Sequence, residues 1–174
     1  MTDETIMGVV PAKMKKGFFA GSESYNLVFT DKRMIMAIMT KEMINAIDQE
    51  VKAADKDAKG ITGAIAVKLH QKAAELKFFE RYYTIPPDKA LGENPQNKEI
   101  GNAAVSSVKI KVLKNDDDDT VGSSDLAGFL FGLESQVGNY NFTVPYNEGF
   151  PKFLQNIYGE NKVHLPFGYK YGIR

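Results

Sequence analysis

The sequence predicts an α+β protein, with a β-sheet core and helices at two places along the chain. Two segments, 24–39 and 104–159, are rich in β-branched, aromatic and long apolar residues. About sixty residues of helical and loop character separate them. A chain of 174 residues suits one domain with its own core, so we predict a single domain over 1–174.

The first β-rich segment predicts a hairpin. Tyr25–Thr30 and Met34–Met39 are its strands, and Asp31 and Lys32 between them have turn chemistry. The second strand, RMIMAIM, is apolar on both faces. It is therefore expected to be a central strand, or one whose outer face is covered by another element such as a helix.

A helical insertion is predicted over 41–83. Thr40 is a suitable N-cap, and apolar residues then recur at intervals of three and four, which places them on one stripe. Gly60 and Gly63 interrupt the pattern, so the region holds two helices or one kinked helix. The stripe includes Ile44, Ile47, Val51, Leu69 and Leu76.

This apolar stripe has two interpretations. It could cover the core of its own domain, which is the commoner use of an amphipathic helix, or it could be an interface with a partner or a second copy of the chain. Ile85 precedes Pro86 and Pro87, which ends the helical region. The polar sequence that follows predicts a long polar loop over 84–103.

The second β-rich segment predicts three strands. Val108, Ile110 and Val112 alternate with Lys109 and Lys111, which indicates a half-buried strand with the lysines outside. An acidic turn over 116–119 follows. The next strand places Phe129, Phe131 and Leu133 on one face, and Gly128 and Gly132 mark a bend or a close approach; the last strand contains Tyr140, Phe142 and Val144.

A capping helix is predicted after the last strand. Pro145 ends that strand, Pro151 suits the first turn of a helix, and Gly159 lies just past its end. The helix has an aromatic-rich face that would dock onto the sheet, formed by Phe150, Phe153, Leu154, Ile157 and Tyr158.

Three stretches, YNLVFTDKRMI, AAVSSVKIKV and YNFTVP leading into a terminal helix, resemble the bacterial and archaeal pleckstrin-homology-like (PH-like) domains. The resemblance covers about the first 40 and the last 70 residues, and its closest matches are TDKR and VSSVKI. It implies a bent, partly open antiparallel β-barrel with a C-terminal capping helix, and here a helical insertion after the third strand. The sequence patterns show fewer strands than the seven of the full fold. A short strand near Ile6–Val10 or in the long loop would supply the seventh, or the barrel is modified.

Composition excludes several classes of function. Lys+Arg and Asp+Glu both total 22, so no overall field favours nucleic acid. The absence of cysteine excludes disulfides, thiolate nucleophiles and cysteine zinc sites, and makes a reducing cytoplasm the expected compartment. The N-terminal sequence lacks the pattern of a signal peptide, and the longest central apolar stretch, 61–67, is far short of a membrane span.

Basic residues near the first hairpin are the candidate ligand-binding group. They lie close in sequence to Phe18 and Phe19, and could bind anionic lipid head groups; they are Lys13, Lys15, Lys16, Lys32 and Arg33. The alternative is a solvated strand edge protected by lysines, which we favour because anion sites usually contain more arginine.

No catalytic, metal or cofactor site is predicted. His70 and His164 have no partner at a recognisable spacing, and the acids at 116–119 lack the ligand pattern of an EF-hand. The glycines of GITGAIA form no phosphate loop. We therefore expect a non-catalytic binding or assembly module, whose partner is another protein or a second copy. Anionic-lipid binding is the alternative, and an unrecognised hydrolase using His70 or His164 is a further one.

Overall fold

The computed structural model describes residues 4–16, 21–54, 79–114 and 126–166. These residues form a mixed α+β fold that is mostly sheet, in agreement with the predicted class. Its strands are β1 (Ile6–Lys15), β2 (Ser22–Thr30), β3 (Arg33–Met39), β4 (Lys98–Gly101), β5 (Val105–Lys114), β6 (Leu126–Ser135), β7 (Gly138–Val144) and β8 (Val163–His164). Its helices are α1 (Lys41–Ala54), α3 (Pro87–Gly92), the 3₁₀ turn η1 (Asn102–Ala104) and α4 (Phe150–Tyr158).

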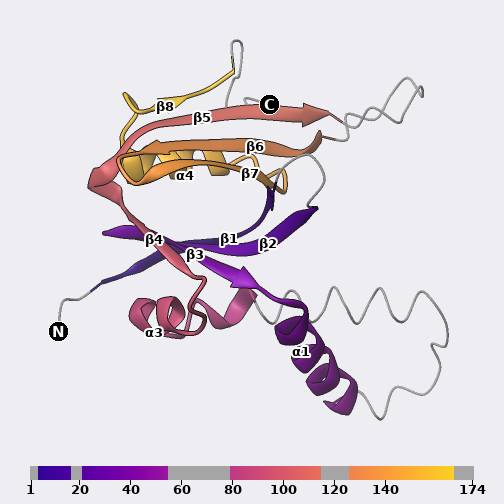
Figure 1. The fold of residues 1–174 in the computed structure, drawn as a ribbon. Coiled ribbons are helices and arrows are strands. Elements are labelled where there is room, and N and C mark those ends of the chain that lie inside the picture. The colour runs from indigo at the N-terminus through magenta and orange to yellow at the C-terminus, as the bar shows by residue number, and fades with distance from the viewer. Residues whose placement is uncertain (1–3, 17–20, 55–78, 115–125, 167–174) are drawn as a thin grey trace, which may run out of the picture.

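The described strands make one sheet in the order β4-β3-β2-β1-β7-β6-β5-β8. Every neighbouring pair is antiparallel except β5 and β8. Figure 1 shows the sheet folded into two layers, β1–β4 below and β5–β7 above, with α3 beneath the lower layer. The layers are joined on one side by β4 running through η1 into β5, and on the other by a short β1–β7 pairing at Lys13↔Thr143 and Met14↔Phe142.

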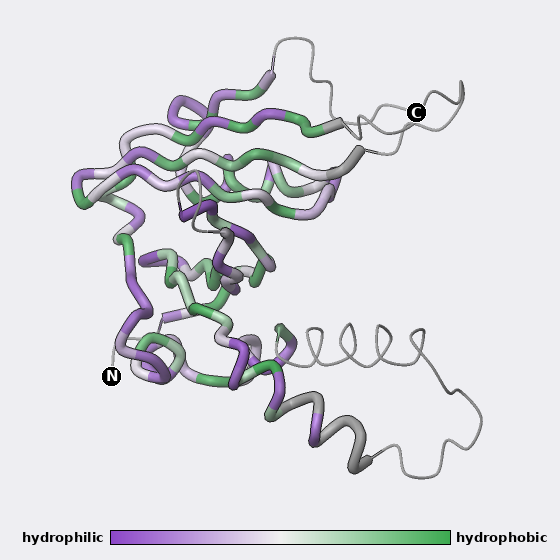
Figure 2. The backbone as a smooth tube through the Cα atoms, turned by 45° about the vertical axis from the view of Figure 1, so that its right-hand side comes forward, coloured by the Kyte–Doolittle hydropathy of each residue, from purple (hydrophilic) through white to green (hydrophobic). Residues whose placement is uncertain are grey.

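The core lies between the two layers and contains residues from both of them and from α4. Phe29 of β2 is at its centre, with ring centroids 6.3 Å from Phe131 and 5.3 Å from Phe153. Figure 2 shows hydrophobic and hydrophilic residues alternating along the upper layer, as expected for strands with one face on the core and the other in solvent. The predicted aromatic face of α4 therefore packs on the sheet.

The local signals for the hairpin and for α4 are confirmed. Phe29 pairs with Met34 across the turn that Asp31 and Lys32 form between β2 and β3. Pro151 lies in the first turn of α4, and Gly159 ends the helix with a φ of 92°, which glycine adopts without steric cost.

A second apolar cluster explains why β3 is hydrophobic on both faces. Ile35 and Ala37 point away from the main core and are fully buried against Tyr82 and Ala90. The residues that cover this side come from α3, from the segment 79–85 and from the start of α1. The expectation of a covered outer face is thus confirmed.

The range 84–103 is not the predicted polar loop, because it contains α3, β4 and the start of η1. Buried Ala90 and Ile100 anchor these elements on the sheet. Asn97 links them: its Oδ1 accepts the Ile38 N–H at 2.8 Å and its Nδ2 donates to the Ala90 carbonyl at 2.9 Å. Two buried apolar residues among many polar ones are a weak signal in the sequence, so the composition of this range indicates a loop.

Both positions considered for the missing strand contain one. β1 includes the stretch Ile6–Val10, and β4 lies inside the range predicted to be a loop. The two-residue strand β8 was not predicted; it pairs in parallel with β5 at Val108↔Val163 and Lys109↔His164.

The range 41–83, for which a helical insertion is predicted, is described only in part. α1 begins directly after β3, and the Met43 N–H donates to the Thr40 hydroxyl at 3.2 Å, as expected for an N-cap. Ile44 is half-buried, and Ile47 and Val51 belong to the same helix. Leu69 and Leu76 lie outside the described residues, so the interface that we predict for this stripe stays a prediction.

Candidate functional site

The predicted basic group does not come together in the structure. The β1–β2 register places Lys15 opposite Ser22, whereas Lys32 and Arg33 follow the other end of β2. At about 3.3 Å per residue, the ten steps from Ser22 to Lys32 put these two sets about 30 Å apart. Lys13, Lys15 and Lys16 therefore form one set, and Lys32 and Arg33 another.

Arg33 is bound by carboxylates of the protein itself. Its Nε and one terminal nitrogen donate to the two carboxylate oxygens of Glu4 at 2.9 and 2.8 Å, and further ion pairs join it to Asp88 and Glu99. Hydrogen bonds to Glu4 are the main reason that the pKa of Arg33 is raised above its ordinary value. With three carboxylates around it, this guanidinium is not available to an anionic ligand.

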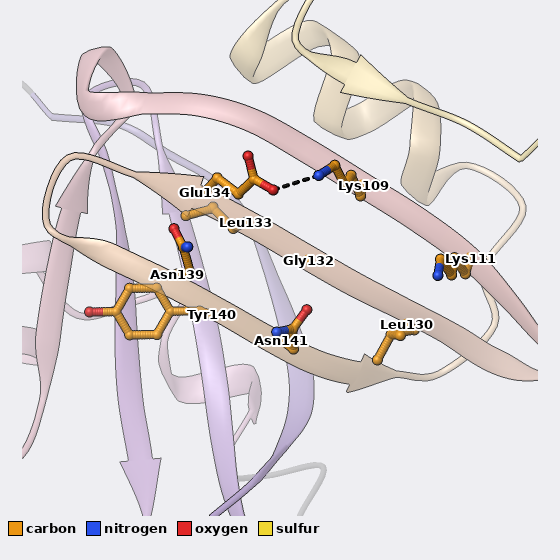
Figure 3. Close-up of a pocket in the computed structure, with 9 residues that line it drawn as sticks. All are labelled: Lys109, Lys111, Leu130, Gly132, Leu133, Glu134, Asn139, Tyr140 and Asn141. Atoms are coloured by element: carbon orange, nitrogen blue, oxygen red, sulfur yellow. Dashed lines mark hydrogen bonds and ion pairs between the residues drawn. The ribbon is translucent and has the colours of Figure 1, made fainter.

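Lys13 and Lys15 instead line a hollow on the outer face of the sheet. A smaller hollow adjoins it, and we call the two together the lysine groove. The groove is lined chiefly by Lys13, Lys15, Lys109, Lys111, Gly132, Asn139 and Asn141. The larger hollow, which Lys13 and Lys15 line, has a volume of about 1070 Å³, and the smaller has about 210 Å³. The two hollows share Asn139, Tyr140, Asn141 and Leu130. Figure 3 shows the smaller hollow, between β5 and β7.

Strand alternation places these side chains outside. Val108 and Ile110 of β5 are buried, so Lys109 and Lys111 point to solvent, as the sequence predicts. On β6, Gly132 contributes no side chain to the floor, where an added Cβ would lie only 3.0 Å from the Asn141 Oδ1. The sequence does not predict that Lys109 and Lys111 line the same groove as Lys13 and Lys15, because this depends on the non-local β1–β7 pairing.

The described residues that line the lysine groove carry an excess of positive charge. Glu134 is its only acidic lining residue within the part of the chain that the structure describes, and it is paired with Lys109 at 2.5 Å. Among the same residues, Lys13, Lys15 and Lys111 form no ion pair. Lys16 is nearby but is paired with Glu23, and this hydrogen bond is the main cause of the lowered pKa of Glu23.

A separate hollow, of about 460 Å³, is mostly apolar. We call it the apolar groove; its lining includes Met7, Val9, Pro11, Tyr83, Tyr146 and Phe153. Met7, Tyr83 and Tyr146 are 44%, 51% and 38% exposed, although each has a large hydrophobic side chain. Tyr146 stacks on Phe129 with 5.0 Å between ring centroids, and Tyr83 packs edge-on against Phe79 at 5.6 Å.

One wall of the apolar groove is the edge of β1. β7 pairs with β1 only at Lys13 and Met14, so no strand of the described ranges pairs with the earlier residues of β1 on this side. The Val9 N–H donates to the Tyr83 hydroxyl at 3.2 Å and therefore points away from β2. Because the outward direction repeats every second residue, Pro11 also faces this edge, and it has no N–H.

No catalytic or metal site is assembled from the described residues. His164 is exposed on β8, while His70 and the acidic run 116–119 lie outside the described residues. No group of three or more His, Asp or Glu in the described ranges is placed to hold a metal ion. The described helices are all too short or too polar to span a bilayer.

Comparisons of the chain with models of known protein families, with curated proteins and with solved structures found no match. A function for this chain is therefore inferred from its fold and surface chemistry.

Proposed function

We propose that the chain is a non-catalytic binding module on a PH-like barrel, and that its apolar groove binds an extended segment of a partner protein. Support for the scaffold comes from topology. Strands β1–β7 are arranged as β4-β3-β2-β1-β7-β6-β5, α4 follows β7 and packs on the core, and α1 follows the third strand. The parallel strand β8 would be an addition to the seven strands of the family.

The observation that carries the proposal is the gathering of exposed apolar side chains. The described residues include four large hydrophobic residues that are exposed, and three of them, Met7, Tyr83 and Tyr146, line the apolar groove. Clustered apolar surface with a polar rim, here Asn147, is typical of an interaction site. Tyrosine is also among the residue types that most often anchor an interface.

The open edge of β1 favours an extended partner segment. The outward Val9 N–H places the Val9 carbonyl on the same side, and the Pro11 carbonyl follows two residues later. A peptide lying along this edge could donate N–H groups to both carbonyls while its side chains contact Met7 and Tyr146. Pro11 has no N–H, and the Val9 N–H already donates to the Tyr83 hydroxyl. The edge therefore offers no free donor at these two residues, which discourages the repeated strand pairing that leads to aggregation.

A displayed library of random peptides, selected against the full chain, tests the proposal. We expect enriched peptides with alternating apolar residues, and titration calorimetry of a synthetic one should give a measurable Kd. Met7→Ser combined with Tyr146→Ser should weaken binding about tenfold or more, because two anchors are lost. Val137→Ser is the matched control, since Val137 is also an exposed apolar residue but lies outside the groove.

Two results would count against this function. Peptide binding that responds equally to the control and to the groove variant would show that the groove is not the site. A concentration-dependent increase of mass in light scattering, abolished by the groove variant, would assign the groove to contact between two copies instead.

Binding of anionic lipid through the first hairpin has less support. Its five basic residues lie in two sets about 30 Å apart along β2. Arg33, the residue best suited to phosphate, is paired with Glu4. The hydrolase alternative has no assembled site to support it in the described part of the chain.

A further inference from the structure

We propose a second binding site, independent of the apolar groove: the lysine groove binds a soluble polyanion that carries at least two linked phosphate groups. Lys13 and Lys15 of β1 form one row of positive charge, and Lys109 and Lys111 of β5 form the other. No residue of the apolar groove takes part in either row.

The spacing of the two rows favours a ligand with more than one anionic group. β1 and β5 are separated by β7 and β6, so three interstrand steps lie between them, or about 14 Å at 4.8 Å per step. Both rows project from the outer face, on either side of a floor formed by β6 and β7. Linked phosphates can contact both rows at once, which matches the charge of the groove over its width.

The floor between the rows supplies neutral hydrogen-bonding groups. Asn139, Asn141 and Thr143 of β7 face the hollow, and Gly132 keeps the floor open beside Asn141. Amide and hydroxyl groups of this kind can donate to bridging and terminal phosphate oxygens. Glu134 is paired with Lys109 at one end of the groove, so Lys13, Lys15 and Lys111 are the row lysines that no carboxylate of the described residues neutralises.

The same surface is poorly suited to a bilayer. Its lysines lie within a hollow on the face of the strands. The exposed large hydrophobic residues of the described part, Met7, Tyr83, Val137 and Tyr146, do not line it. Peripheral membrane binding usually combines basic residues with apolar groups that insert at the interface. A soluble ligand is therefore the better match.

Titration calorimetry with inorganic tripolyphosphate, at low and at moderate salt, tests the inference. We expect saturable binding that weakens with salt and is at least about tenfold tighter than binding of inorganic monophosphate. Lys13→Ala with Lys15→Ala should weaken it about tenfold, and Lys109→Ala with Lys111→Ala should do the same. Lys41→Ala with Lys89→Ala is the matched control, because it removes two exposed lysines outside the groove.

A further variant changes charge without changing size. Asn141→Asp adds a carboxylate to the floor and should weaken tripolyphosphate binding, with circular dichroism and the unfolding midpoint confirming an intact fold. The groove variant Met7→Ser with Tyr146→Ser should leave tripolyphosphate binding unchanged, which separates this site from the proposed peptide site.

Three outcomes would overturn the inference. An equal loss in the control variant would mean diffuse attraction to surface charge. A loss in only one of the two lysine pairs would exclude a ligand that bridges both rows. Binding to vesicles containing anionic lipid, measured by co-sedimentation, without binding of tripolyphosphate would make the groove a membrane-facing surface.

Discussion

Arg33 and Glu4 form a bidentate ion pair that fixes the segment before β1 to the first residue of β3. Two nitrogens of the guanidinium donate to the two carboxylate oxygens, at 2.9 and 2.8 Å, and the Arg33 side chain is only 17% exposed. The Thr30 hydroxyl donates to the same carboxylate at 2.6 Å. The pair thus belongs to a small network around the β2–β3 turn, to which Asp88 of α3 and Glu99 of β4 also connect.

We predict that Arg33→Lys lowers the free energy of unfolding by about 2 kcal/mol, because a lysine cannot make both bonds to Glu4. Urea denaturation of the two proteins, followed by circular dichroism, measures the difference. Asp88→Asn is the control: this carboxylate is 88% exposed, so removing its charge should change stability by less than about 0.5 kcal/mol. An equal effect of both substitutions would refute the special role of the Arg33–Glu4 pair.

The placement of Arg33 illustrates what the sequence could not predict. Its partners are 29, 55 and 66 residues away, in the segment before β1, in α3 and in β4. The local pattern identifies Arg33 as a basic residue after a turn, and binding of an external anion is one role that such a residue can have. Two of the three carboxylates, those of Asp88 and Glu99, lie in the range 84–103, for which the sequence predicts a loop.

Elements with strong local signals were predicted well. RMIMAIM, the alternation around Ile110, and Pro151 with Gly159 each define an element by its own periodicity or caps. The two candidate sites depend instead on pairing between distant strands. Lys13 and Lys111 lie on opposite sides of the lysine groove only because β1 pairs with β7, and no short-range pattern encodes that register.

Buried tyrosines should make the protein sensitive to high pH. Burial is the main cause of the raised pKa of Tyr25, Tyr82 and Tyr158, with Glu23 and Glu93 adding to it at the first two. Their pKa values in the unfolded chain are about 10. A raised pKa in the folded state gives stability that is complete below about pH 10 and is lost as the pH rises further. We therefore expect alkaline unfolding above about pH 10, together with delayed tyrosinate absorbance.

Tyr82 and Tyr158 give a matched pair for this prediction. The Tyr82 hydroxyl donates to Glu93 at 3.1 Å, whereas the Tyr158 hydroxyl has no hydrogen-bond partner among the described residues. Tyr82→Phe should lower stability at pH 7 by about 1 kcal/mol, and Tyr158→Phe should leave it unchanged or raise it. Both should weaken the loss of stability above pH 10. An unchanged alkaline limb in both variants would contradict the assignment.

Gly128 should tolerate no side chain, because β6 passes very close to the end of β7 at this residue. Its φ is 155°, and an added Cβ would overlap the Val144 carbonyl oxygen, which is backbone and cannot move aside alone. The neighbouring residue Phe129 pairs with Val144 in the ladder and is fully buried. We predict that Gly128→Ala lowers the free energy of unfolding by about 1–3 kcal/mol.

Gly92→Ala is the control for this substitution. Gly92 lies in α3, and a Cβ added there would meet no atom within 4 Å, so alanine should leave stability unchanged or raise it by up to about 1 kcal/mol. Native-state hydrogen exchange adds a local test. The strain in the Gly128→Ala variant should raise the rate of amide hydrogen exchange first in the β6–β7 ladder around Phe129. If the two alanine variants unfold at the same urea concentration, the close approach of Gly128 to Val144 does not contribute to stability.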